Sequence, residues 1–140
     1  MANDSRRRDY QQVFYRNKVA FELAVTRESA FLSFALPDPQ KEGSFHWRGK
    51  QTFALRPIEA GEILATIRNG GEARFFHDPS MRSQNRTQER KVLRVRRKPE
   101  SREVEIRLAV GENQFFITLT AGESEVLCIL LSEFIKLASQ

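Results

Sequence analysis

The sequence predicts an α+β fold in which four short strands and a helix are followed by four more strands and a second helix. Apolar and polar residues alternate with a period of two over 19–25 and over 103–110, which indicates strands with one buried face. Pro57 suits the first turn of a helix, and Thr120 with Glu123 forms a capping box at the start of another. The chain of 140 residues is long enough for one domain with one core.

The first half opens with residues 1–12, which we expect to form a flexible basic tail ahead of a domain spanning 13–140. Pro37 and Pro39 end the second apolar strand, because a proline cannot donate a hydrogen bond to a sheet. We expect strands over 19–25, 31–36, 45–47 and 51–55, and a helix from Pro57 to about Ile67.

The second half repeats this order after the turn Asn69-Gly70-Gly71. Leu55 and Glu59 recur as Leu119 and Glu123 at an offset of 64 residues, which suggests an internal repeat. We expect a mobile polar loop over 79–89, strands over 74–77, 91–98, 103–110 and 114–119, and a last helix ending at about Ala138.

Positive charge is concentrated in one segment of the chain. Residues 82–107 contain ten Lys or Arg and four Glu, a net charge of +6, whereas the remaining residues sum to −1. Concentrated positive charge attracts polyanions and speeds their capture, so this segment is a candidate binding surface. The alternative is a solvated basic face without a partner.

Several classes of protein find no support in the sequence. No apolar run approaches the roughly 20 residues that a membrane helix needs, so we expect no membrane span. Cys128 is the only cysteine, which rules out a disulfide within the chain. No metal-ligand spacing, Gly-rich phosphate loop or nucleophile motif is present, so we expect neither an enzyme nor a cofactor or metal. Asp78 before Pro79 fits a turn better than a catalytic role.

The last helix raises the question of assembly. Its segment 126–131 is apolar for six consecutive residues, whereas a helix that lies on one sheet needs only one apolar stripe. We therefore expect a homo-oligomer built on this helix, unless the helix is buried between two sheets of one chain. The expected interface consists of Leu127, Leu130, Leu131 and Phe134.

Four motifs in order resemble the Whirly family of single-stranded DNA-binding proteins. The segment 75–79, Phe-Phe-His-Asp-Pro, matches a family motif outright, and 90–95, Arg-Lys-Val-Leu-Arg-Val, resembles its Arg-Lys-Val-Leu-Lys-Val strand. Residues 45–55 resemble its segment of a Trp, a Lys-Gln pair and a Phe-x-Leu strand. Residues 15–21 look like a diverged Lys-Gly-Lys-Ala-Ala-Leu motif, in which Arg16 replaces the first Lys. The resemblance extends from about Val13 to Leu137.

The resemblance implies two antiparallel four-stranded sheets packed crosswise, with helices at their ends. It also implies a tetramer joined through those helices, with single-stranded DNA running along the sheets and a role in DNA maintenance or transcription regulation. Residues 1–12 carry both Arg and Asp, which argues against an organelle transit peptide. We therefore expect a bacterial cytoplasmic, nucleoid-associated protein, with an organelle stroma or matrix as the alternative.

Aromatic rings and cations near the motif positions are the candidate binding residues. An aromatic side chain on a sheet stacks with any unpaired base for about 1–3 kcal/mol, while Lys and Arg neutralise phosphates. Arg94 and Arg96 lie on one face of their strand, opposite Leu93 and Val95. Phe75 and Phe76 must point to opposite sides, so only one is available. The predicted contacts are Tyr15, Arg16, Lys18, Phe45, Trp47, Arg48, Lys50, Phe75, Lys91, Arg94 and Arg96.

Two other functions remain open at this point. An RNA-binding module would use the same sheet chemistry, and only contacts to the 2′-hydroxyl would distinguish it. A protein-interaction scaffold would instead present the basic segment to an acidic partner.

Overall fold

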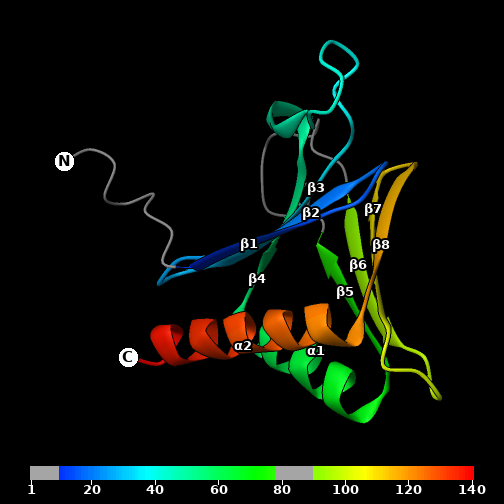
Figure 1. Cartoon of the computed structure of the whole chain (residues 1–140). Helices are drawn as coiled ribbons and strands as arrows, with labels where there is room; N and C mark the ends of the chain where they lie inside the picture. Colours follow the sequence, from blue (N-terminus) through cyan, green and yellow to red (C-terminus); the bar gives the residue numbers. More distant parts are fainter. Residues whose placement is uncertain (1–9, 78–89) are drawn as a thin grey trace.

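Two antiparallel four-stranded sheets cross each other and share their inner faces with two helices. The computed structural model describes residues 10–77 and 90–140. One sheet has the strand order β1-β2-β3-β4 and the other the order β5-β6-β7-β8, and each is followed by a helix. Figure 1 shows the strands of the two sheets running at a steep angle to each other, with α1 and α2 side by side along one end. The predicted α+β fold with its repeated order of four strands and a helix is confirmed.

The elements follow one another without crossovers. In the first half they are β1 (Tyr10–Tyr15), β2 (Ala20–Val25), β3 (Ala30–Ala35), the 3₁₀ turn η2 (Trp47–Gly49), β4 (Gln51–Leu55) and α1 (Pro57–Asn69). In the second half they are β5 (Gly71–His77), β6 (Lys91–Arg97), β7 (Val104–Val110), β8 (Asn113–Leu119) and α2 (Ala121–Ala138). The expected mobile loop at 79–89 lies outside the described residues.

The first strand, β1, is not among the strands expected from the sequence. β1 starts at Tyr10, so residues 10–12 belong to the sheet and not to a tail. Only Phe14 in this edge strand is buried. The strand therefore lacks the alternation of apolar and polar residues from which β2 could be predicted. Residues 1–9 lie outside the described part of the chain.

The strand predicted over 45–47 is wrong. Phe45 makes only an isolated bridge to Pro37, and Trp47 begins the turn η2. Beside that bridge, His46 N–H donates to the carbonyl of Leu36 at 2.8 Å, and the chain then turns on itself, since Gly49 N–H donates to the carbonyl of His46 and Lys50 N–H to that of Trp47. The segment therefore touches the end of β3 at one point and does not extend the ladder between β3 and β4.

One hydrophobic core joins the two sheets and both helices. Phe21, Phe34 and Phe53 from the first sheet and Leu93 and Ile106 from the second are almost fully buried in the same cluster. Alternate residues of the strands therefore point inward. The residues between them are exposed or half-buried in the second sheet, whereas in β2 every residue, and in β3 every residue but Phe31, is buried. No helix among the described residues is long and apolar enough to cross a membrane.

Helix α2 is covered by its own chain on the side that we expected to form an oligomer interface. Leu127, Leu131 and Phe134 are buried in the core, and Leu130 packs against it. The helix contacts α1, β1, β2 and β8, so the two layers together cover more of its circumference than one sheet would. Leu127, Leu131 and Phe134 therefore need no second chain to bury them, whereas Leu130 is half-buried. The exposed apolar side chains of α2 are Val126 and Ile129.

Replacement of Phe134 by Ala tests how much the packing of α2 in the core contributes to the free energy of unfolding. Phe134 has no exposed surface, so its truncation should reduce the free energy of unfolding by about 3–5 kcal/mol in urea denaturation. The matched control is Ile58→Ala on α1, which should change that free energy little because Ile58 is 77% exposed. Equal losses in the two variants would contradict this description of α2.

Candidate nucleic-acid interface

A row of three arginines crosses the outer face of the second sheet. The registers place Arg74 of β5 opposite Arg94 of β6, Arg94 opposite Arg107 of β7, and Arg107 opposite Phe116 of β8. Neighbouring strands are about 4.8 Å apart, so the three cations stand side by side across the sheet. Arg96 lies on the same face of β6, one step along the strand from Arg94. We call this outer surface of β5–β8 the arginine face.

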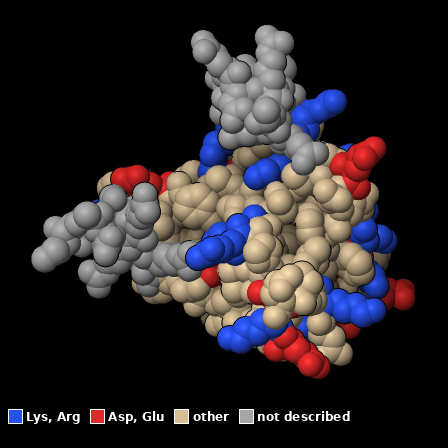
Figure 2. Space-filling view, turned by 90° about the horizontal axis from the view of Figure 1, so that it is seen from above, with Lys and Arg blue, Asp and Glu red and all other residues tan. Residues whose placement is uncertain are grey.

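The arginine face is only partly neutralised by acids. Arg94 forms an ion pair with Glu72 at 3.1 Å, and Arg107 forms one with Glu105 at 3.6 Å. Arg74 and Arg96 have no ion-pair partner within residues 10–77 and 90–140. Figure 2 shows Lys and Arg side chains along the side of the molecule that these strands form, with acidic groups between them. Net positive charge therefore remains on this surface.

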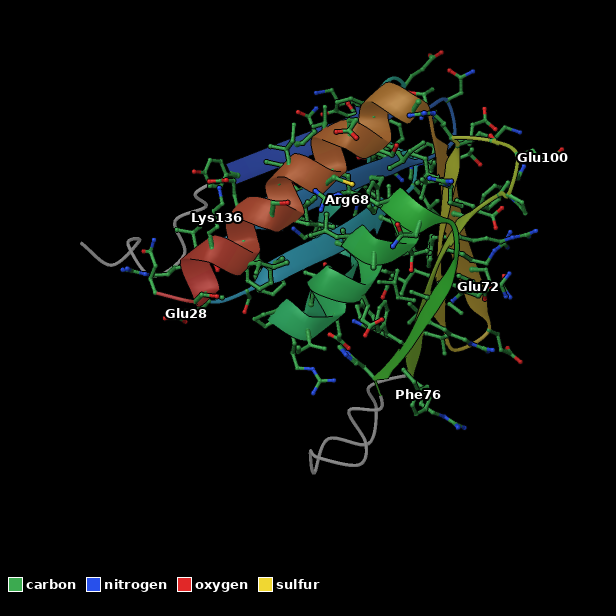
Figure 3. The ribbon with its side chains drawn as sticks, turned by 90° about the horizontal axis from the view of Figure 1, so that it is seen from below. Glu28, Arg68, Glu72, Phe76, Glu100 and Lys136 are labelled. Carbon is green, nitrogen blue, oxygen red and sulfur yellow. The ribbon has the colours of Figure 1, made fainter. Side chains whose placement is uncertain are left out.

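Two exposed phenylalanines flank the arginines. Phe76 near the end of β5 is 57% exposed, and Phe116 on β8 is 51% exposed. The guanidinium of Arg107 lies 4.8 Å from the centroid of the Phe116 ring, a cation–π contact. In Figure 3, Glu72 and Phe76 lie on the side of β5 that faces away from the two helices. The face thus combines cations with ring surfaces that a flat ligand can reach.

A second, mainly aromatic surface lies on the outer side of the first sheet. The rings of Tyr15 and Phe45 are 5.8 Å apart, and Trp47 lines a shallow pocket with Tyr15. Lys50 also lines this pocket and lies 3.7 Å from the carboxylate of Glu22, which is buried. We call Tyr15, Phe45 and Trp47 the aromatic patch. Tyr15 is its most accessible member, being 60% exposed.

A groove adjoins the arginine face. It has a volume of about 390 Å³ and runs between the β1–β2 turn and the edge strand β8. Its walls are mainly apolar, with Leu36 and Phe116 among them, and Arg16 and Lys18 contribute the cations. Phe116 therefore belongs both to the groove and to the arginine face.

Arg16 is occupied by a contact within the chain. Its guanidinium donates to both carboxylate oxygens of Glu123, at 2.6 and 3.0 Å, and to the carbonyl of Thr118 at 3.0 Å. These bonds fasten the β1–β2 turn to β8 and to the first turn of α2. The hydrogen bonds from Arg16 lower the pKa of Glu123 below its ordinary value, although burial opposes them.

Lys91 and Phe75 point inward. The amine of Lys91 donates to the backbone carbonyl of Thr52 at 2.6 Å, and burial lowers the pKa of this lysine. Phe75 packs against the core, so its neighbour Phe76 is the accessible member of the pair. Arg48 and Lys18 are exposed, whereas Lys50, Arg94 and Arg96 take part in the two surfaces described above.

A buried carboxylate links α1 to the end of β5. Burial raises the pKa of Glu59, but the hydrogen bonds from the Arg56 N–H, from His77 and from the Arg56 side chain outweigh it, so the pKa lies below its ordinary value. Nε2 of His77 lies 2.9 Å from this carboxylate, and the His77 ring stacks on Phe53. His77 therefore serves the fold at this junction. No cluster of three or more potential metal ligands occurs among the described residues.

Sequence reasoning did not single out three members of the arginine face, Arg74, Arg107 and Phe116, and it left open whether Phe75 or Phe76 is exposed. The signal for Arg107 was present, because it sits between the inward-facing residues Ile106 and Leu108 in a strictly alternating strand. The in-register row could not be predicted, since it depends on how β5, β6, β7 and β8 pair.

Fold and surface together define an α+β protein of two crossed antiparallel sheets with cations and rings on their outer faces. The family described as "Whirly transcription factor" matches residues 12–130, and the chain belongs to the Whirly family. The single-stranded DNA-binding protein WHY2, mitochondrial, of Arabidopsis thaliana is 36% identical over 74 residues, which are 53% of this chain and 30% of WHY2. This chain thus aligns with less than a third of that relative.

Solved structures show the same fold. WHY1 from Arabidopsis thaliana matches with a TM-score of 0.72 at 20% identity, over 90% of this chain and 82% of WHY1. A guideRNA-binding protein complex bound to a gRNA matches with a TM-score of 0.64 at 9% identity, over 95% of this chain and 93% of the other. The bacterial cytoplasmic location expected from the sequence finds no support in these relatives, whereas the organellar alternative is consistent with WHY2.

The ion pair between Arg16 and Glu123 should make the free energy of unfolding depend on pH. A carboxylate with a lowered pKa in the folded state stabilises the fold above its unfolded pKa and loses that contribution as the pH falls through the folded value. Between about pH 6 and about pH 3, Glu123→Gln should therefore lose less free energy of unfolding than the unaltered chain. The control is Glu125→Gln, since Glu125 is exposed on the same helix. If both variants follow the unaltered chain, Arg16 does not hold Glu123 in solution.

Proposed function

We propose that this chain binds single-stranded DNA with little sequence specificity and acts in DNA maintenance or transcription regulation. The observation that carries the proposal is the in-register row of Arg74, Arg94 and Arg107 beside the exposed rings of Phe76 and Phe116. Membership of the Whirly family and the name of WHY2 support it, because that relative is described as a single-stranded DNA-binding protein. The role is one of binding, without catalysis.

The expected preference for single strands follows from the ring faces of the bases, which duplex formation hides. Paired bases keep their ring faces in the stack, whereas unpaired bases expose them to aromatic side chains. Arginines that stand a strand spacing apart can each neutralise a phosphate and release its counterions. Neither contact reads the edge of a base, so most sequences are tolerated. The aromatic patch of Tyr15, Phe45 and Trp47 and the groove beside Lys18 extend the surface over the first sheet.

RNA is the second candidate ligand. The observation that favours it is the shared fold with the guideRNA-binding complex, although at 9% identity that likeness concerns the fold alone. Stacking and phosphate contacts serve DNA and RNA alike, so the two are separated by the titration described next.

Binding should be strongest for single strands and should weaken steeply with salt. We expect tighter binding to single-stranded DNA than to matched duplex in fluorescence anisotropy at several salt concentrations, with matched RNA as a third ligand. The double variant Arg74→Ala, Arg96→Ala should reduce the slope of log affinity against log salt by about 0.7 for each phosphate contact removed. Arg27→Ala, in the exposed β2–β3 turn, is the control for loss of charge alone.

The rings are tested in the same titration. Phe116→Ala should weaken binding to single strands by about 1–3 kcal/mol and leave duplex binding nearly unchanged, while Trp47→Ala reports on the aromatic patch. Equal affinity for duplex and single strands, insensitive to Phe116→Ala and Trp47→Ala, would refute the stacking mechanism. Tighter binding to RNA than to DNA would replace DNA by RNA as the ligand.

We further infer that the chain forms a homo-oligomer through the exposed side of α2, with a tetramer implied by the family resemblance. Val126 and Ile129 leave apolar surface on this helix, at 38% and 58% exposure. A second subunit that packs on this helix would cover this apolar surface. Of the residues predicted from the sequence, Leu127, Leu131 and Phe134 are buried in the core, so the proposed contact consists of Val126 and Ile129 with the half-buried Leu130.

Ile129→Glu should dissociate the assembly without unfolding the subunit. A charge in a buried apolar contact costs several kcal/mol, whereas the same change on an open surface costs little. Light scattering coupled to size-exclusion chromatography should show a smaller species for Ile129→Glu with unchanged circular dichroism. Glu125→Gln, one turn away, should leave the mass unchanged. A monomeric unaltered chain at micromolar concentration would refute the inference.

A further inference from the structure

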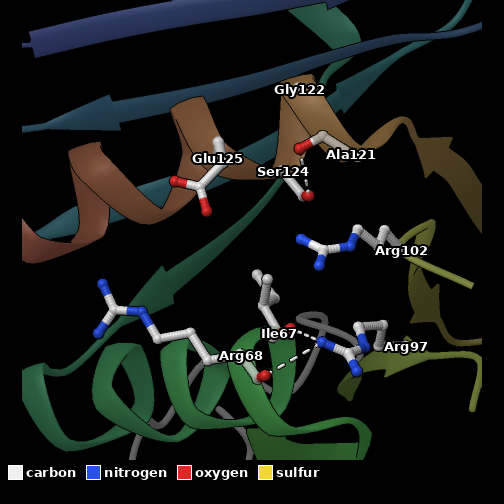
Figure 4. A pocket seen from close by; sticks show the side chains of 8 residues that line it. All are labelled: Ile67, Arg68, Arg97, Arg102, Ala121, Gly122, Ser124 and Glu125. Carbon is white, nitrogen blue, oxygen red and sulfur yellow. Dashed lines mark hydrogen bonds between the residues drawn. The ribbon is translucent and has the colours of Figure 1, made fainter.

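A cavity of about 340 Å³ lies between the two helices and the β6–β7 turn, apart from both outer surfaces (Figure 4). Three arginines from three different elements line it: Arg68 from α1, Arg97 from the end of β6 and Arg102 from the β6–β7 turn. Glu125 is the one acidic residue in the lining. Arg97 belongs to the inward-facing series of β6, opposite in direction to Arg94 and Arg96. The cavity is therefore separate from the arginine face.

The charges of this cavity are not compensated by neighbouring acids. The side chains of Arg68, Arg102 and Glu125 form no ion pair or hydrogen bond within residues 10–77 and 90–140. Elsewhere Arg16, Arg94 and Arg107 each have a carboxylate partner. Guanidinium groups that face one cavity repel each other unless an anion lies between them. The lining thus carries an excess of positive charge that the described residues do not neutralise.

Arg97 adds an unused donor. Its Nη1 donates to the carbonyls of Ile67 at 2.8 Å and Arg68 at 3.1 Å, which ties β6 to the end of α1. Its Nε is fully buried and has no hydrogen-bond partner among the described residues. A buried donor without an acceptor is rare in folded proteins, and an anion or ordered water commonly completes such a site.

The first turn of α2 contributes backbone donors to the same cavity. Ala121 and Gly122 line it, and their N–H groups precede the first intrahelical hydrogen bond. The capping box uses the N–H groups of Thr120 and Glu123, so it leaves these two unoccupied. The backbone at Gly122 is open, since a Cβ there would meet no atom within 4 Å. The partial positive charge of the helix start reinforces that of the arginines.

We propose that this cavity binds a phosphate monoester. A doubly charged phosphate matches a lining of three arginines and one carboxylate, and its oxygens can accept from Arg102 and from the backbone N–H groups of Ala121 and Gly122. Arg68, whose guanidinium lies at the other end of the lining in Figure 4, contributes positive charge. A single negative charge would leave more of the arginine charge unpaired. The group is either the terminal phosphate of a nucleic-acid strand or that of a free mononucleotide. Binding here is independent of stacking on the outer faces.

The test follows the backbone amides of the full chain by ¹H–¹⁵N NMR during titration with adenosine monophosphate. Sodium chloride at matched ionic strength is the reference. The amides of Ala121 and Gly122 should shift and saturate with adenosine monophosphate and not with chloride. The double variant Arg68→Ala, Arg102→Ala should weaken this response by about tenfold or more, because it removes charge-assisted hydrogen bonds. Arg27→Ala should keep it. Both replaced arginines are exposed, so the fold should survive.

The source of the phosphate is decided by two oligonucleotides of one sequence, one with a 5′-phosphate and one with a 5′-hydroxyl. A terminal phosphate as ligand predicts tighter binding of the phosphorylated strand, an advantage that disappears in Arg68→Ala, Arg102→Ala. A free mononucleotide predicts saturation by adenosine monophosphate and equal binding of the two strands. Amide shifts that are absent, or unchanged in the double variant, would overturn the proposal. The double variant Arg74→Ala, Arg96→Ala should leave these amide shifts intact. A failure of the proposed binding on the arginine face can therefore be told apart from a failure of the phosphate site.

Discussion

Burial of the two inner sheet faces in one shared core is the constraint on which the rest of the molecule depends. Each strand has only two faces, so the decision about which residues fill the core also decides which residues stand outside. Leu93 and Val95 are buried, and because side chains alternate along a strand, Arg94 and Arg96 must point outward. A slip of one residue in register would reverse this arrangement and place cations in the core.

The same constraint explains why arginines line up across the second sheet. Antiparallel pairing brings residues directly opposite one another, and like charges in opposite positions destabilise a sheet. Glu72 and Glu105 relieve part of that cost at Arg94 and Arg107, but Arg74 lies at the edge of the row without such a partner among the described residues. A surface that retains net charge in this geometry attracts anions, because an anion between the arginines would remove a repulsion that the folded protein carries.

Much of the fold was accessible from the sequence because strong local patterns coincide with it. The alternation in β2 and β7, the helix starts at Pro57 and Thr120, and the outward direction of Arg94 and Arg96 all follow from residue spacing. β1 was not predicted, because an edge strand with one buried side chain shows no alternation of apolar and polar residues. The segment of Phe45 and Trp47 has the composition of a strand, yet it makes only one bridge to Pro37 before it enters the turn η2.

Long-range partners account for what the sequence could not reveal about the candidate site. Apolar residues on α2 looked like an interface, but the count of apolar positions does not tell how many layers of the same chain cover a helix. Likewise, spacing alone cannot show which of Phe75 and Phe76 faces the core, because a strand can place either residue on its inner face. The structure separates them through the packing of Phe75 against the core.

Charge counted along the chain is therefore a poor measure of charge available to a ligand. Arg16 is held by Glu123, Lys91 by the carbonyl of Thr52 and Arg97 by the end of α1, so these cations connect elements of the fold. The formal net charge of +5 treats them in the same way as Arg74 and Arg96. The distinction arises from geometry: a lysine in place of Arg16 has no planar fork with which to bind both oxygens of Glu123 and the carbonyl of Thr118 together. At this position, where the resembled motif has lysine, the arginine side chain fastens the turn whose Lys18 lines the groove, and Lys18 itself stays exposed.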